Sequence, residues 1–307
     1  MSTIAQLGAA INRECDLRLA GRDPAVAMPL FTNAGYNWTP PVDPPVAGVS
    51  YLAPNVKCWL QPLRRQLTPV MFESGYWYQG LGFTPLTPHH GVSVSHWGPD
   101  VGTVLEFAGP DGQLFKTHIT HWINDHMADG NPDLSIYRWA DALPDWVFIP
   151  PIAHAAMTLS AFASAGQPIP TVALSQGDPD THYDPTQPHD SGFSYLHTPS
   201  AKTWCPDNRK MYVNVNATGT RAGFQHLPTI GDSGAPEYIL CNGILYLYGV
   251  LQLSDGTSVP IAANLAYLNS MIARSQAAAG DSTVYTVTAA PMPVLNDQPK
   301  NFIPYGN

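Results

Sequence analysis

Apolar residues in this chain recur mostly in short runs with a period of two, which predicts β-strands rather than long helices. Between residues 67 and 145 the runs include PVMFESGYWYQG, GVSVSHW, GTVLEFAG, LFKTHITHW and DLSIYRW. In the last of these, Leu134 and Ile136 face one side of the expected strand, and Ser135 and Tyr137 face the other. Gly, Pro, Asp or Asn separates most of the runs, as is typical of turns. We therefore expect one all-β unit in this region.

A second series of strand-like runs follows a connector, DALPDWVFIPPIAHAAMTLSAFASAGQPIP, whose Ala-rich middle could form a short helix. The series consists of TVALSQ, GFSYLHT, KMYVNVNA, APEYILCNGILYLYGVLQL and SVPIAAN. Within it, YILCNGILYLYG predicts a β-hairpin, because Asn242 and Gly243 supply the two positive-φ positions of a tight turn. We expect a second all-β unit here.

Only one stretch, residues 264–280, has clear helical spacing, with Asn264 as its expected cap and Gly280 as its end. Its apolar positions are Leu265, Leu268, Met271 and Ile272. The first 66 residues contain NWTPPVDPPVAG, which cannot be a central strand or a helix interior. We expect an irregular N-terminal extension over the core, in which VKCWLQ could add an edge strand. The last residues, from 281, are expected to form an extended tail.

Composition agrees with many short strands, since charged residues make up 12% of the chain while Pro (31) and Gly (25) are abundant. The net charge of −9 and the lack of a Lys/Arg cluster argue against a nucleic-acid partner. No apolar run approaches the roughly 20 residues that span a bilayer, so no membrane span is expected. Length and composition therefore favour a large core that needs no cofactor or metal to fold.

The N-terminus, MSTIAQLGAAINRECDL, lacks a basic segment followed by a long apolar one, so no standard secretory signal is expected. This favours a cytoplasmic or particle-associated location over secretion. The four cysteines, Cys15, Cys58, Cys205 and Cys241, are widely scattered. Without a secretory signal, free buried thiols are a better prediction than two disulfides.

The stretch TIGDSGAPEYIL, residues 229–240, carries the main candidate chemistry. It could be a plain β-turn, or it could hold Ser233 as a nucleophile on a tight turn. A nucleophilic serine needs a base, and no histidine follows His226, which excludes the α/β-hydrolase order. The base must come earlier. LTPHHGVSVSHWG offers His96 at a strand end, and NPDLSIYRW offers Asp133 at a strand start.

Competing residues exist for both partners. His89 and His90 are the nearest alternatives to His96 as the base. Asp100 and Asp125 compete with Asp133 as the acid, and Asp133 could instead cap a helix or a strand.

Four segments together, GDSGAP, LTPHHGVSVSHW, DLSIYRW and the C-terminal helix, resemble the chymotrypsin-type (trypsin-like) serine protease family over about residues 67–280. The resemblance implies that Ser233 attacks a carbonyl, that His96 removes and returns the proton, and that Asp133 fixes the imidazole tautomer. It also implies an oxyanion hole made by the N–H groups of Gly231 and Ser233.

The family's fold implies an all-β protein with two six-stranded antiparallel β-barrels and a C-terminal helix, preceded in this chain by the Pro-rich N-terminal extension. The expected division of the chain is then 1–66 for the extension, 67–150 for the first barrel, 151–263 for the second, 264–280 for the helix and 281–307 for the tail.

The same resemblance implies the substrate-binding residues. Leu227 stands at the floor of the primary specificity pocket, where an acid would select Lys or Arg. We therefore expect a small or apolar side chain at the cleavage site. Gln252, Leu253 and Ser254 are expected along one wall of the pocket.

Two features depart from the family. Asp232, the acid beside the serine, pairs in the animal enzymes with an amine freed by cleavage, but about 95 residues precede His96 here with no obvious activation site. Asp232 therefore needs another partner, for which Arg221 or His226 is available. No cysteine flanks His96 either.

Two groups of residues invite a metal-binding interpretation. THITHWINDH brings His118, His121 and His126 close in sequence, but residues three apart on a strand face opposite sides. The loop SQGDPDTHYDPTQPHDSG lacks the glycine and glutamate pattern of an EF-hand. Its acids are Asp178, Asp180, Asp184 and Asp190. We expect no metal and no cofactor.

Two functions remain open from the sequence. The first is a serine endopeptidase acting on a protein or peptide substrate. The second is a protease-like fold used as a structural or binding module, for example in a virus particle, with a triad that is inactive or only self-processing. Ordered tails against an assembly partner would favour the second function, whereas an open cleft with Ser233 within hydrogen-bond reach of His96 would favour the first.

Overall fold

The computed structural model describes most of the chain. The described residues are 2–28, 30–32, 53–67, 70–72, 82–96, 98–108, 114–125, 131–175, 193–197, 199–204, 211–213, 219–224, 233–252 and 258–295.

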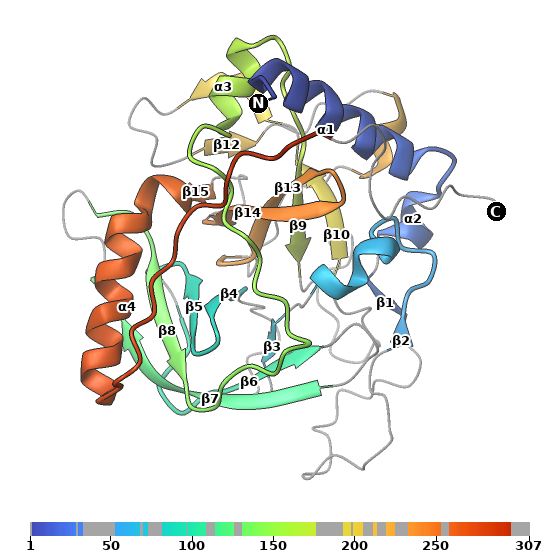
Figure 1. The fold of residues 1–307 in the computed structure, drawn as a ribbon. Coiled ribbons are helices and arrows are strands. Elements are labelled where there is room, and N and C mark those ends of the chain that lie inside the picture. Colours follow the sequence, from blue (N-terminus) through green and yellow to red (C-terminus); the bar gives the residue numbers. More distant parts are fainter. Residues whose placement is uncertain are drawn as a thin grey trace.

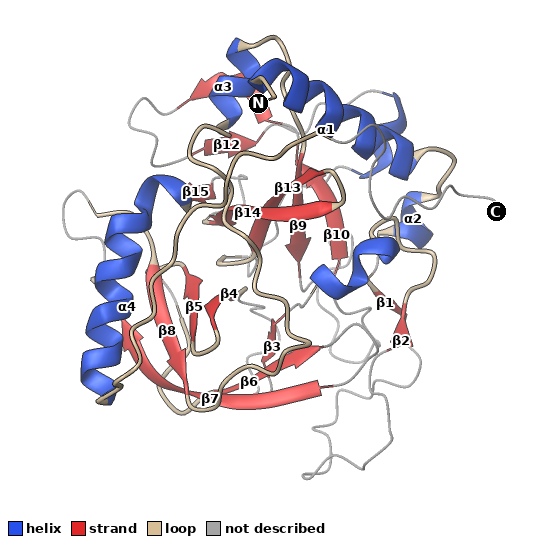
Figure 2. Ribbon diagram, viewed as in Figure 1, coloured by secondary structure: helices blue, strands red, loops and turns tan. Residues whose placement is uncertain are grey.

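The described chain is mostly antiparallel β-structure with a C-terminal helix (Figures 1 and 2). The first sheet has six strands in the order β3-β6-β7-β8-β5-β4. They are β3 (Val70–Phe72), β4 (Thr84–Thr87), β5 (His90–Ser93), β6 (Val104–Ala108), β7 (Leu114–Ile123) and β8 (Ser135–Trp139). Each of the expected runs between 67 and 145 contains one strand, and β4 is an addition that the sequence pattern did not predict.

The second sheet has seven described strands, one more than expected, in the order β10-β9-β13-β14-β15-β12-β11. They are β9 (Thr171–Ser175), β10 (Phe193–His197), β11 (Pro199–Trp204), β12 (Met211–Val213), β13 (Pro236–Cys241), β14 (Ile244–Leu251) and β15 (Ser258–Pro260). Neither strand order closes on itself within the described residues. A short third sheet pairs β1 (Phe31–Thr32) with β2 (Ala53–Pro54).

Strand β8 shows the expected alternation, although both of its faces are buried. Leu134 and Ile136 belong to a central apolar cluster that also contains residues of the second sheet, such as Leu240 and Leu247. Tyr137 packs in a separate cluster within the first sheet. The first sheet therefore contributes to two cores, one of which it shares with the second sheet.

The predicted hairpin is confirmed. Strands β13 and β14 pair antiparallel from Cys241↔Ile244 onward. Asn242 (φ 57°) and Gly243 (φ 73°) both occupy the left-handed region between them, as a type I′ turn requires. Asn tolerates this conformation better than other residues with a side chain, and Gly adopts it without strain.

The predicted C-terminal helix is also confirmed, as α4 (Leu265–Ala279), which follows the 3₁₀ helix η3 (Ala262–Asn264). Gly280 ends it in the left-handed conformation, with φ 71°. The Asn264 side chain does not cap the helix as expected, because its amide donates to the carbonyl of Pro260 (2.7 Å). Helix α4 packs against β7 and β8 of the first sheet (Figure 1).

The expectation that residues 1–66 are irregular is wrong for residues 4–19, which form helix α1 (Ile4–Leu19). Thr3 and Gln6 make a capping box at its start. Its Leu7 and Ile11 pack with Ile239 on the outer face of the second sheet. The apolar residues at four-residue spacing, Leu7, Ile11, Cys15 and Leu19, carried this signal.

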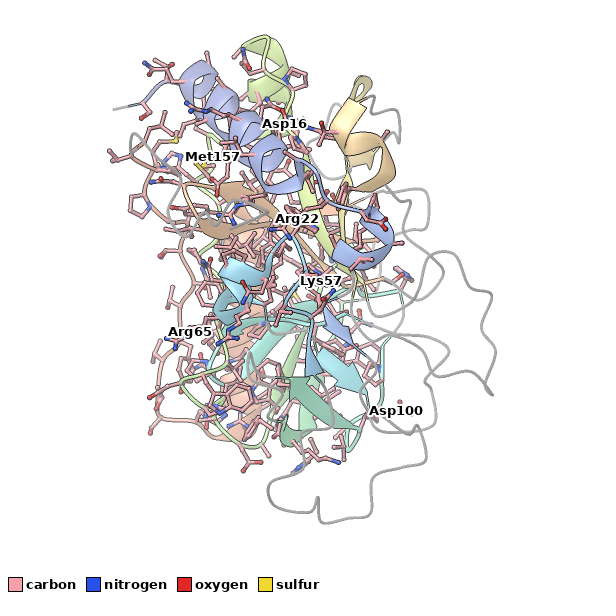
Figure 3. All side chains as sticks on the ribbon, turned by 90° about the vertical axis from the view of Figure 1, so that its right-hand side faces the viewer. Asp16, Arg22, Lys57, Arg65, Asp100 and Met157 are labelled. Carbon is pink, nitrogen blue, oxygen red and sulfur yellow. The ribbon has the colours of Figure 1, made fainter. Side chains whose placement is uncertain are left out.

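The rest of the N-terminal region contains the short helix α2 (Pro24–Ala27) and the 3₁₀ helix η1 (Gln61–Gln66). VKCWLQ does not add the edge strand considered above, because it forms turns that lead into η1. Arg22 ties this region to the end of α1 by donating to the carbonyl of Lys57 (2.9 Å), and Figure 3 labels both residues.

The connector between the two β units contains the expected short helix, α3 (Leu159–Ser164). The tail from 281 to 295 has no strand and runs back across the molecule (Figure 1). It is held by a bond from the Ala290 N–H to the carbonyl of Ile152 (2.8 Å).

The thiols of Cys15 and Cys241 are free and buried, as predicted, and Cys58 is also buried, whereas Cys205 lies outside the described residues. No helix in the described segments is both long and apolar enough to cross a membrane.

Candidate active site

Two neighbouring strands bring His96 and Asp133 together. β5 runs antiparallel to β8, with Ser93 opposite Ser135. Residues just after β5 therefore meet residues just before β8 at the same end of the two strands. His96 and Asp133 occupy those two positions. The Nδ1 atom of His96 lies 2.6 Å from Oδ2 of Asp133.

The carboxylate of Asp133 is buried and well supplied with donors. Its Oδ1 accepts hydrogen bonds from the Ser95 N–H (2.9 Å), the Ser95 hydroxyl (2.6 Å) and the His96 N–H (2.9 Å). Burial acts to raise the pKa of Asp133, but the bonds from His96 and Ser95 outweigh it and hold that pKa well below its usual range. Asp133 is therefore a carboxylate at neutral pH.

The competing histidines are engaged elsewhere. His90 is buried, with its Nδ1 2.8 Å from the Thr87 hydroxyl, and His89 Nδ1 lies 3.3 Å from the carbonyl of Trp139. Among the described residues, His96 is the histidine that bonds Asp133.

The competing acids are also separate from this pair. Asp125 forms an ion pair with Arg274 of α4, at 2.7 Å. Asp100 is exposed on the turn that precedes β6.

Ser233 lies on a turn directly before β13. Its hydroxyl donates to the carbonyl of Gln252 (3.1 Å), and its own carbonyl accepts from the N–H of Gly82 (3.1 Å). The next residue, Gly234, has φ 85° and donates to the carbonyl of Leu251 (2.7 Å). Main-chain bonds thus hold the Ser233 turn to Gly82 on one side and to Leu251, at the end of β14, on the other.

This turn packs against the first sheet at the strand that leads to His96. A Cβ on Gly234 would lie 2.0 Å from the Ser93 hydroxyl oxygen, which itself donates to the carbonyl of Gly82 (2.9 Å). Ser93 precedes His96 by three residues, a span of at most about 10 Å. The Ser233 turn therefore packs against the strand that leads to His96, and no hydrogen bond joins the Ser233 hydroxyl to His96 in the described structure.

Several expected site residues lie outside the described residues. They are Leu227, Gly231, Asp232, Leu253 and Ser254, together with His226. Gln252 is described and buried. Its side-chain Oε1 has no hydrogen-bond partner among the described residues.

Arg221, considered above as a partner of Asp232, is hydrogen-bonded to helix α1. It lies on the 3₁₀ helix η2 (Gly219–Phe224) and donates to Asp16 (2.6 and 2.9 Å) and to the side chain and carbonyl of Asn12 (2.8 and 3.0 Å). Figure 3 labels Asp16 on α1. Asp232 lies outside the described residues, so its pairing with Arg221 or His226 stays a prediction.

Within the described chain, no cluster of three or more His, Cys, Asp or Glu side chains is arranged to hold a metal ion. His118 is exposed on β7 and His121 half-buried, while His126 and the acidic loop 176–192 lie outside the described residues.

Sequence reasoning did not identify Ser95, Ser93 and Gly82 as parts of the site. The alternation in GVSVSHW places Ser93 and Ser95 on one face of the strand and so carried a signal. Gly82 carried none, because its contact with Ser233 depends on how the two sheets pack.

No family model matches the chain, and no curated protein is significantly similar to it. The function is therefore inferred from the geometry of the site.

Proposed function

We propose that this protein is a chymotrypsin-type serine endopeptidase that hydrolyses peptide bonds through an acyl-enzyme on Ser233. One observation carries the proposal: a histidine bonded to a buried carboxylate follows strand β5, against which a serine-bearing glycine turn packs. The order His96, Asp133, Ser233 along the chain is the one that the resemblance requires.

In the proposed reaction, Asp133 accepts a hydrogen bond from the Nδ1–H group of His96. The Nε2 atom of His96 is then unprotonated and can accept a proton. The Ser233 hydroxyl turns from the Gln252 carbonyl, transfers its proton to Nε2 and attacks the peptide carbonyl. His96 then gives that proton to the leaving amine. A water molecule next gives a proton to His96 and attacks the acyl-enzyme, which releases the carboxylic acid product and returns the proton to Ser233. The N–H groups of Gly231 and Ser233 are proposed to bind the oxyanion.

We also propose that the two sheets belong to two β-barrels, with the catalytic residues between the barrels. The antiparallel pairing throughout both sheets and the six strands of the first are compatible with it. We assign substrate binding to Leu227, Gln252, Leu253 and Ser254, with a small or apolar side chain favoured at the cleavage site.

A second candidate function has one observation in its favour. The Ser233 hydroxyl donates to a main-chain carbonyl instead of to His96. A serine fixed in that way would leave the fold as a structural or binding module, for example in a virus particle, inactive or cleaving only itself.

Peptide hydrolysis tests the choice between the two functions. The wild type, Ser233→Ala and His96→Ala would each be incubated with a mixture of unstructured polypeptides, and new termini would be identified by mass spectrometry. We expect cleavage by the wild type alone, after small or apolar residues. Equal cleavage by folded Ser233→Ala would refute the proposed role of Ser233, and no cleavage by the wild type would favour the module.

A further inference from the structure

The hydroxyl of Ser95 is aimed at a catalytic candidate, unlike those of the serines beside it. Ser95 is 2% exposed, and its hydroxyl lies 2.6 Å from Oδ1 of Asp133. By contrast, the Ser93 hydroxyl donates to the carbonyl of Gly82 and the Ser135 hydroxyl to that of Val94. A hydrogen bond to a charged group is roughly twice as strong as one between neutral groups.

The two carboxylate oxygens of Asp133 have different partners. Oδ1 accepts the N–H and hydroxyl of Ser95 and the N–H of His96, whereas Oδ2 accepts from His96 Nδ1. Three donors on one oxygen fix the rotation of the carboxylate about its Cβ–Cγ bond. They also leave Oδ2 directed at the imidazole.

The two peptide groups that donate to Asp133 are themselves held at their carbonyl ends. The peptide between Val94 and Ser95 accepts the Ser135 hydroxyl at 2.6 Å, and the one between Ser95 and His96 accepts the Asn124 amide at 2.8 Å. A bond to the carbonyl of a peptide strengthens its N–H as a donor. Ser95 is thus at the centre of a network that ends on the carboxylate.

We propose that Ser95 is a positioning residue for the reaction proposed above: its hydroxyl fixes the Asp133 carboxylate so that Oδ2 holds the Nδ1 proton of His96. The inference rests on the proposed function for its effect on rate, but not for its effect on the His96–Asp133 bond. Without the hydroxyl, only the two main-chain donors remain on Oδ1, so the carboxylate and the imidazole bonded to it are held less firmly. A threonine retains the hydroxyl and should restore both.

The test combines kinetics with proton NMR on the full chain. Ser95→Ala, Ser95→Thr and the control Ser275→Ala would be compared with the wild type, after circular dichroism has confirmed that each is folded. Ser275 is a matched buried serine on α4, and its hydroxyl has no hydrogen-bond partner among the described residues.

We expect Ser95→Ala to lower kcat by about tenfold or more, because it removes a hydrogen bond to a charged group, which is among the stronger kinds. KM should stay within about twofold, because the residue positions and does not bind substrate. Ser95→Thr and Ser275→Ala should keep the wild-type kcat. An unchanged kcat in Ser95→Ala would overturn the proposal.

The NMR measurement separates this proposal from the proposed function. The downfield resonance of the His96 Nδ1 proton would be followed in the Ser233→Ala background, where no turnover occurs. Broadening or loss in Ser95→Ala, with recovery in Ser95→Thr, supports positioning even if the wild type hydrolyses no peptide. A sharp resonance that is identical in Ser95→Ala overturns it.

Discussion

At the scale of single residues, the site depends on glycines that let the two sheets approach. Gly234 combines a positive φ of 85° with a neighbour that leaves no room for a side chain, because a Cβ would lie 2.3 Å from the carbonyl oxygen of Gly82. The clash is with main-chain atoms and with a buried hydroxyl, so a small adjustment does not relieve it. Gly234 therefore keeps the Ser233 turn against the first sheet.

Replacing Gly234 by alanine should move the turn and remove any activity of Ser233. The matched control is Gly280→Ala, since Gly280 has φ 71° but nothing within 4 Å of an added Cβ. The control should lose only about 1–2 kcal/mol of unfolding free energy, from backbone strain alone. Urea unfolding and peptide hydrolysis of both variants check this. Equal destabilisation with retained activity would contradict the account.

His90 gives the fold a dependence on pH. Burial, together with the charges of Arg138 and His89, lowers the pKa of His90 to about 4, whereas the unfolded value is near 6.5. The charge of Asp281 opposes this shift and that of His121 adds to it. Because the unfolded chain binds this proton more tightly, stability is full above the unfolded pKa and is lost as the pH falls from about 6.5 to about 4.

The change His90→Asn should reduce that dependence, because it removes the titrating group. Between about pH 7.5 and pH 5, the wild type should lose about 2 kcal/mol more unfolding free energy than the variant. Urea unfolding at the two pH values measures the difference. Equal losses in both proteins would show that His90 does not titrate as its burial implies.

At the scale of elements, helix α1 is joined to the hairpin that follows Ser233. Glu14 and Arg18 are both buried in α1 and lie 2.9 Å apart. Glu14 also accepts the N–H of Gly243 (3.0 Å), which lies in the β13–β14 turn. One carboxylate thus satisfies a buried guanidinium and a main-chain donor of the second sheet.

The change Glu14→Gln should cost about 1.5–3 kcal/mol of unfolding free energy, because it replaces the charged hydrogen bonds between Glu14 and Arg18 by weaker neutral ones while keeping an acceptor for Gly243. The double variant Glu14→Gln/Arg18→Met should recover most of that loss, since it buries no charge. Denaturant unfolding of both variants tests this. A double variant less stable than the single one would contradict the interpretation.

The elements differ in how far they could be predicted from the sequence. The β13–β14 hairpin and α4 were predicted well because their signals are local: Asn242-Gly243 in one case and apolar spacing with Gly280 in the other. Helix α1 was not predicted because its apolar residues lie four apart beside a Pro-rich segment that indicates irregular structure. Strand β4 was missed because TPLT has a proline and no long alternation.

At the scale of the whole molecule, the two sheets share one apolar cluster. Ile136 of the first sheet and Leu240 and Leu247 of the second belong to it, together with Leu268 of α4. Sheets that share a core should unfold together. The sequence could not predict this, because alternation identifies a buried face but does not say what covers it.

The change Ile136→Ala should cost about 2–5 kcal/mol of unfolding free energy and lower the stability of both sheets equally. Calorimetry should give a single transition in the wild type and in the variant, and Ile136→Val should lose only about 0.5–1.5 kcal/mol. Two separate transitions in the variant would show that the sheets are independent units.

The candidate site was predictable to different degrees, because the sequence indicates strand ends but not how side chains pack. His96 and Asp133 could be paired from the sequence because each stands at the end of a recognisable strand. The hydrogen bond from the Ser233 hydroxyl to the Gln252 carbonyl could not be predicted, because the rotamer of Ser233 depends on the packing around it. Ser95 was visible in the alternation, but its carboxylate partner becomes known only from the register of β5 and β8.

The central claim is that Ser233 is an activated nucleophile, and labelling with a fluorophosphonate probe tests it most directly. The account predicts a single covalent adduct, located on Ser233 by peptide mapping, which is absent in Ser233→Ala and His96→Ala and present in Ser275→Ala. An unlabelled wild type that is folded, or an adduct that persists in folded His96→Ala, would contradict it.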